Sequence, residues 1–257
     1  MPVRNSYVQG TPNWIDLSAT DQEAAKDFYG ELFGWTFDDQ PMPEGVYSMA
    51  LKDDGLVGAI SVLPPDLAAQ NSPAMWNTYL AVDDVDAALA RVDAAGGKTV
   101  MAAFDVTDAG RMAFIIDPTG APVALWQAGN HIGATLVNET GSFIWNDLRT
   151  DDVGGAASFY EAVFGLIPDA QEWDEAPYIS LRTGADAVAG ISTRTDEDAP
   201  NEWQIYFAVD DTEGVTAHAR SMGARVILEP TDTPIGPMAT LADPQGAVFN
   251  VISISKP

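Results

Sequence analysis

The chain has 257 residues, 46% of them hydrophobic, which is enough for two domains that each bury a core. It contains no cysteine, which excludes disulfides, thiolate metal sites and cysteine nucleophiles. A formal net charge of -26 argues against nucleic acid and anionic membranes as partners, because 12 basic residues cannot offset the protein's own field and a phosphate backbone together. Such a charge favours cationic ligands, or serves only solubility.

The sequence also lacks the patterns of targeting and membrane segments. No run of eighteen apolar residues occurs, and the first fourteen residues hold no apolar core of a secretion signal. We therefore expect a soluble globular protein located in the cytoplasm.

In chain order, the first predicted elements are a strand and a helix within residues 12–35. Ile15 and Leu17 alternate with polar or aromatic neighbours, which is the period of two of a strand with one face in a core. Asp21 is placed to cap the following helix, whose apolar residues recur at a spacing near 3.6, and Gly34 ends it.

This pattern returns 131 residues later, within residues 143–166. Asp152 takes the place of Asp21, and Gly165 takes that of Gly34. A repeat at a fixed offset indicates two homologous halves.

Further elements follow the same scheme in both halves. In the first half, Pro64 to Pro73 is predicted to be a loop, and a helix is predicted over 85–95 with Asp83 or Asp84 as its cap. The other strands of this half are predicted at 46–51, 56–63, 75–82, 99–104, 112–116 and 122–127. In the second half we predict strands at 178–182, 188–193 and 203–209, and a helix over 211–222. The turn Asp117-Pro118-Thr119-Gly120 before a last strand recurs as Asp243-Pro244-Gln245-Gly246.

Four βαβββ units, with a Thr-Asp plus Phe-Tyr helix motif and an Asp-Pro-x-Gly turn, resemble the vicinal oxygen chelate superfamily. That group includes glyoxalase I, fosfomycin-resistance enzymes, extradiol dioxygenases and bleomycin-resistance proteins, and the chain looks most like its two-domain actinobacterial members. The resemblance implies an α+β fold with curled mixed sheets that form cups. It places two tandem domains at 8–128 and 141–257, joined by a linker at 129–140. Which units pair to form each cup stays open, as does the choice between monomer and homodimer.

In this family, metal ligands project into the cup from the first, middle and last strands. Counting from the motifs carries these positions to Trp14, Asn77 and Ala124, and to Trp145, Gln204 and Asn250. No histidine or carboxylate occupies any of the six, and amides or indoles do not replace them as ligands of first-row metals. We therefore predict no metal and no other cofactor, and hence none of the family's metal-dependent chemistry.

Strand alternation predicts which residues face the same cup as these positions. The first cup gains Asp16, Tyr79 and Trp126, and the second gains Asp147, Tyr206 and Ile252. Tyr47 and Tyr178 also correspond at 131 residues, either as caps of the cups or as ordinary strand aromatics. Asn146 is a polar misfit on a face predicted to be core. His218 is predicted to be a solvated helix position, and His131 in the linker either reaches a cup mouth or lies only at the surface.

The pair Trp14 and Asp16, repeated as Trp145 and Asp147, suggests an aromatic wall with one acid, on which a flat ligand stacks while the carboxylate binds a polar or cationic group. Our first hypothesis is a metal-independent protein that binds a small hydrophobic, aromatic or cationic molecule, by sequestration or as an accessory in its metabolism. The second is a lyase, isomerase or hydroxylase-like enzyme with Asp16 or Asp147 as general base. The third is a structural or interaction module in which tryptophans fill both cups.

Overall fold

The computed structural model of the protein describes residues 4–42, 45–171, 177–194, 196 and 198–253, so the predicted domain end at 254–257 lies outside the described residues. The first half contains β1 (Pro12–Ala19), α1 (Gln22–Phe33), β2 (Thr36–Met42), β3 (Gly45–Lys52), β4 (Gly55–Val62), α2 (Pro65–Ala69), β5 (Met75–Ala81), α3 (Val85–Ala94), β6 (Lys98–Val106), β7 (Gly110–Ile116) and β8 (Pro122–Ala128). The second contains β9 (Phe143–Thr150), α4 (Val153–Phe164), β10 (Ile167–Gln171), β11 (Tyr178–Thr183), β12 (Asp186–Thr193), β13 (Glu202–Ala208), α5 (Thr212–Ser221), β14 (Arg225–Thr231), β15 (Met238–Ala242) and β16 (Val248–Ile252).

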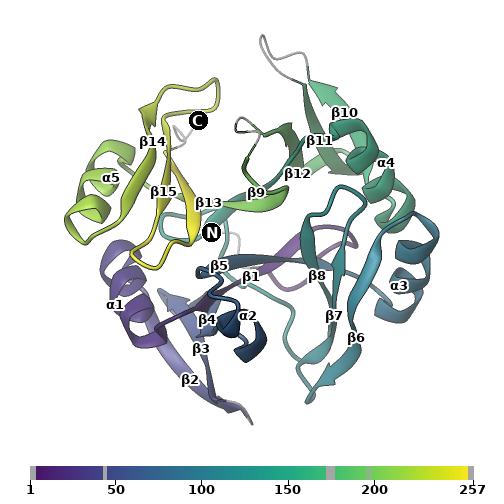
Figure 1. The fold of residues 1–257 in the computed structure, drawn as a ribbon, viewed down its shortest axis with the longest axis horizontal. Helices are drawn as coiled ribbons and strands as arrows, with labels where there is room; N and C mark the ends of the chain where they lie inside the picture. Colours follow the sequence, from purple (N-terminus) through teal and green to yellow (C-terminus); the bar gives the residue numbers. More distant parts are fainter. Residues whose placement is uncertain (1–3, 43–44, 172–176, 195, 197, 254–257) are drawn as a thin grey trace.

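Each half forms one curled eight-stranded mixed sheet (Figure 1). The strand orders are β2-β3-β4-β1-β5-β8-β7-β6 and β10-β11-β12-β9-β13-β16-β15-β14. The two units of a half join through antiparallel pairing of their first strands, β1 with β5 and β9 with β13. Both cups are therefore built within a single chain and within one half each, which answers the question that the sequence left open.

The predicted helix caps are confirmed. The Asp21 side chain accepts a hydrogen bond from the Ala24 amide, and the Asp152 side chain accepts one from the Gly155 amide. Both helices end at a glycine in the left-handed region, Gly34 or Gly165, where a side chain would be strained. Asp84, and not Asp83, caps α3.

Two details of the first half differ from the prediction. Strand β2 was not predicted, because it lies at a sheet edge and its residues are mostly exposed, so they show no alternation of apolar and polar side chains. The stretch from Pro64 to Pro73, predicted to be a loop, contains the short helix α2, which Pro65 begins and which buries no residue.

The helices join the two halves into one core. Figure 1 shows α1 beside α5 and α3 beside α4, so that a helix from each half meets one from the other. Rings of α1 pack on strands of the second half: Phe33 lies 4.8 Å from Phe207, and Tyr29 lies 5.6 Å from Phe249, between centroids. The two domains therefore share their hydrophobic cores.

A reciprocal pair of hydrogen bonds links the two sequence motifs across the halves. The Tyr29 hydroxyl donates to Asp243 over 3.0 Å, and the Tyr160 hydroxyl donates to Asp117 over 3.0 Å. Each tyrosine belongs to the Phe-Tyr helix of one half, and each aspartate to the Asp-Pro-x-Gly turn of the other. These motifs thus hold the domains together and lie outside the cups.

The misfit Asn146 also lies at the junction of the halves. Its side-chain amide donates to the Thr78 hydroxyl over 2.9 Å, from β9 to β5, and both residues are buried. A buried polar side chain is tolerated where it has such a partner. The buried face of β9 therefore meets the other domain here and not a helix.

Candidate functional site

The first cup holds a closed hydrogen-bond network around Asp16. One Asp16 oxygen accepts from the Tyr47 hydroxyl at 3.0 Å and the Tyr79 hydroxyl at 2.7 Å, and the other accepts from Asn77 at 2.8 Å. The Trp14 indole donates to the Tyr47 hydroxyl at 2.8 Å. Burial raises the pKa of Asp16, and the three donors partly offset that effect. The structure thus brings the predicted residues of the first cup together. Their hydrogen-bond donors, however, are already bonded to acceptors within the same cup.

His131 from the linker occupies the space between the two tryptophans of this cup. Its ring centroid lies 4.5 Å from that of Trp14 and 5.6 Å from that of Trp126, and the Trp126 indole donates to the His131 carbonyl at 2.7 Å. Of the two positions open for His131, the structure shows the one at the cup, because the linker carries the side chain inward. Burial lowers the pKa of His131 to about 4. The first cup is therefore filled by side chains of the chain itself.

The linker is fixed in this position by hydrogen bonds to the side chain and the backbone of Asn13. Asn13 donates to the Ile132 carbonyl at 3.0 Å and accepts at its own carbonyl from the Ala134 amide at 2.8 Å. Gly133, between them, has a φ of 108°, and a Cβ there would overlap the Asn13 carbonyl. His218 differs from His131, since it lies half-exposed on α5 beside Glu31, as predicted for a solvated helix position.

The second cup encloses a cavity of about 540 Å³. Cavities of this size bind drug-sized molecules. Its polar lining consists of Asp147, Arg149, Tyr178, Ser180, Ser192, Tyr206 and Thr233. Its apolar lining includes Ile144, Trp145, Ile235, Met238 and Ile252, with Ile235 at the loop between β14 and β15. The two halves have thus diverged, with one filled cup and one open cup.

Asp147 and Arg149 make most of the contacts among the polar residues that line the cavity. Asp147 accepts a hydrogen bond from Ser192 at 2.6 Å and lies 3.6 Å from Nε of Arg149. Arg149 Nη2 donates to the Tyr206 hydroxyl at 2.8 Å, and the Trp145 indole donates to the Tyr178 hydroxyl at 3.0 Å. Burial raises the pKa of Asp147, an effect that the charge of Arg149 opposes.

A glycine of the second cup, Gly190, lets Tyr178 and Asp147 approach the backbone closely. Gly190 pairs with Asp147, and Ala59 pairs with Asp16 at the matching place in the first half. A Cβ at Gly190 would overlap the Tyr178 hydroxyl and an Asp147 oxygen. Tyr178 therefore sits deeper in its cup than an alanine would allow.

The two remaining predicted residues of the second cup bond to each other. The Asn250 side chain is fully buried, accepts from the Thr240 hydroxyl at 2.7 Å and donates to the side-chain oxygen Oε1 of Gln204 at 3.2 Å. Gln204 in turn donates to Glu202 at 3.2 Å. Neither Gln204 nor Asn250 is among the residues that line the cavity.

The residues of the second cup do not fit the metal that the fold family implies. The three counted positions supply an indole and two amides already bonded to neighbours, and the cation Arg149 lies in the same wall. Within the described ranges, no group of three or more histidine, aspartate or glutamate side chains is arranged to hold a metal ion.

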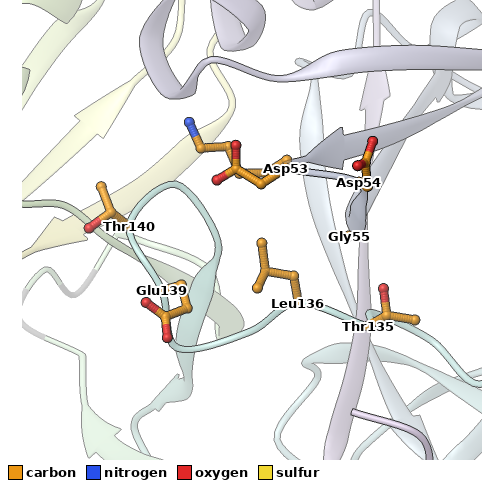
Figure 2. A pocket seen from close by; sticks show the side chains of 8 residues that line it. Asp53, Asp54, Gly55, Thr135, Leu136, Glu139 and Thr140 are labelled. Atoms are coloured by element: carbon orange, nitrogen blue, oxygen red, sulfur yellow. The ribbon is translucent and has the colours of Figure 1, made fainter. Parts of the chain in front are cut away.

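A second cavity, of about 520 Å³, lies between the turn after β3 and the linker (Figure 2). Figure 2 shows the carboxylates of Asp53, Asp54 and Glu139 spread around Leu136 without converging on one point. This arrangement lacks the converging donors or acceptors of a binding site. The second cup is the stronger candidate.

Sequence comparison identifies the family. The Glyoxalase/Bleomycin resistance protein/Dioxygenase superfamily matches residues 11–125 and 131–251. The chain belongs to this superfamily. A protein of Mycobacterium tuberculosis named "Putative glyoxylase CFP32" is 53% identical over 98% of both chains. The anthracycline biosynthesis protein DnrV of Streptomyces peucetius is 36% identical over 96% of this chain and 94% of its own length.

Solved structures show the same fold at low identity. The Mn(II)-bound glyoxalase of Novosphingobium aromaticivorans superposes with a TM-score of 0.67 at 16% identity, covering 96% of this chain and 83% of that chain. The 2,3-dioxygenase LapB of Pseudomonas sp. KL28 gives 0.66 at 16% identity, covering 97% and 94%. In the part of the chain that the structure describes, no helix is long and apolar enough to cross a membrane.

Sequence reasoning missed several residues of the cavity. Arg149 continues the alternation of Trp145 and Asp147 along β9, so the same period of two would have found it. Ser192 and Ser180 come from β12 and β11, whose register against β9 only the folded sheet provides. The loop residue Ile235 had no signal in the sequence.

Proposed function

We propose that this protein binds a planar, hydrophobic small molecule with fused aromatic rings in the cavity of the second cup. The observation that supports this best is the cavity itself, whose lining combines the Trp145 indole and aliphatic side chains with hydroxyl and charged groups. Burying about 200 Å² of aromatic surface contributes roughly 5 kcal/mol before the cost of association. The sequence also predicted a cationic ligand as an alternative. Arg149 makes this alternative less favourable, because its positive charge lies beside Asp147, the carboxylate that would bind the cation.

The relatives support the same class of ligand. DnrV and the similar DauV of a Streptomyces species are named for anthracycline biosynthesis, and both align with nearly the whole of this chain. Anthracyclines carry a planar system of fused rings with keto and hydroxyl oxygens. A role in holding such a molecule, as carrier or accessory, fits a cup without metal ligands.

The test is binding of 9-fluorenone, a planar ketone of three fused rings, measured by equilibrium dialysis. Trp145→Ala is expected to weaken binding about tenfold or more, because an aromatic wall is lost. Trp14→Ala is the matched control: it removes an indole from the filled cup, so it should lower thermal stability and leave the affinity unchanged. Absence of binding by the wild-type protein, or equal affinity in Trp145→Ala, would refute the proposal.

A second candidate function is proton abstraction next to a carbonyl group, with Asp147 as general base. It is favoured by a buried carboxyl group of raised pKa at the cavity wall, while Asp16 is enclosed by its donors. Proton NMR of 1-tetralone in D₂O would follow exchange of the protons beside its carbonyl. We expect exchange above the buffer rate that falls at least about a hundredfold in Asp147→Asn. Equal exchange in the two proteins would exclude this role.

A further inference from the structure

The two cups differ in charge at one position of their first strands. Arg149 corresponds to Ser18 at the repeat offset of 131 residues. Ser18 accepts a hydrogen bond from Asn77 at 3.1 Å and adds no charge. Arg149 brings a guanidinium group that is about one-fifth exposed and lines the cavity.

The replacement of Ser18 by Arg149 changes the hydrogen bonding of the corresponding tyrosines, Tyr79 in the first cup and Tyr206 in the second. In the first cup, the Tyr79 hydroxyl donates to Asp16 at 2.7 Å. In the second, the Tyr206 oxygen accepts from Arg149 Nη2 at 2.8 Å, and its own hydrogen has no acceptor among the described residues. Arg149 Nη1 likewise makes no hydrogen bond within the described part of the chain. The second cup thus keeps unused donors, where the first uses its donors internally.

The surrounding charges limit what these donors can bind. Asp147 on β9 lies 3.6 Å from Arg149 and offsets its charge, and Glu202 on β13 is its pairing partner across the strands. Tyr178 on β11 and Tyr206 on β13 contribute hydroxyl groups. With a carboxylate already paired to the guanidinium, the site favours a neutral acceptor oxygen over a fully charged anion.

We propose that Arg149, together with the Tyr206 hydroxyl, sets the specificity of the second cup for aromatic molecules that present a keto or phenolic oxygen. This inference rests on the proposed function and names the polar group that its ligand must carry. The fused rings lie against Trp145 and the aliphatic lining, and the oxygen lies between Arg149 Nη1 and the Tyr206 hydroxyl. An aromatic hydrocarbon of the same shape leaves both donors unpaired and desolvated, which costs affinity.

Two ligands that differ by one oxygen test this inference. 9-Fluorenone has a carbonyl group where fluorene has a methylene group, and both are planar. Equilibrium dialysis is expected to give about tenfold or greater preference of the wild-type protein for the ketone. In Arg149→Met the preference should fall to about twofold or less, with fluorene affinity unchanged. Arg220→Met, which removes an exposed guanidinium on α5 that does not line the cavity, should keep the full preference.

A second set of variants allows for misfolding of Arg149→Met, which leaves Asp147 buried without its cation. Asp147→Asn alone should keep the ketone preference, and Asp147→Asn combined with Arg149→Met should lose it. Binding of both compounds with an unchanged ratio in the Arg149 variants would overturn the inference and leave the proposed function standing. Binding of neither compound by the wild-type protein would overturn both.

Discussion

Phe249→Ala is expected to destabilise the whole molecule by about 4 kcal/mol, because truncating a buried phenylalanine leaves a large cavity. The Phe249 ring is fully buried on β16 in the second half. It contacts Phe28, Tyr29 and Phe33 of α1 in the first half, at centroid distances of 6.4, 5.6 and 6.2 Å. Since the two halves share this cluster, both should lose stability together.

Guanidinium-induced unfolding, followed by circular dichroism and by tryptophan fluorescence, measures this effect. We expect coincident single transitions by both probes, in the wild-type protein and in the variant. Phe104→Ala is the matched control, because that ring is 43% exposed on the edge strand β6, and its loss should cost about 0.5 kcal/mol or less. Two separate transitions, of which Phe249→Ala moves only one, would contradict a shared core.

The second large effect concerns pH and the histidine that fills the first cup. Burial lowers the pKa of His131 to about 4, below its usual value near 6.5, so the unfolded chain binds a proton more readily than the folded one. Above both pKa values His131 is neutral in the folded and in the unfolded chain, so it does not lower the free energy of unfolding there. As the pH falls from 6.5 toward 4, stability is lost, amounting to about 2 kcal/mol between pH 7 and pH 5.

The buried carboxyl groups act in the opposite direction, so the histidine has to be isolated by a variant. The pKa values of Asp16, Asp147 and Glu202 are raised by burial, which makes the folded state gain stability as these groups protonate. His131→Phe keeps an aromatic ring between the tryptophans and removes the titration. The free energy of unfolding of this variant, relative to wild type, should rise by about 2 kcal/mol from pH 7 to pH 5. A pH-independent difference would show that the imidazole is accessible to protons.

The open cavity and its lining were only partly predictable. Alternation along β1 and β9 correctly brought Asp16 to Trp14 and Asp147 to Trp145, because the period of two is a local property of the backbone. The tryptophans themselves do not distinguish the two cups, since the Trp14 and Trp145 indoles each donate to a tyrosine hydroxyl. The difference arises from the linker that carries His131 into the first cup and from the charge of Arg149 in the second.

The sequence by itself determined the family, the doubled architecture and most of the helices and strands, because repeats, caps and apolar periodicity are encoded within short stretches. It also placed no histidine or carboxylate at the six counted positions. Only the tertiary structure decided that each cup forms within one half, and that Tyr29 and Tyr160 bond to aspartates of the opposite half. Such contacts join residues up to 214 positions apart, and no local pattern specifies them.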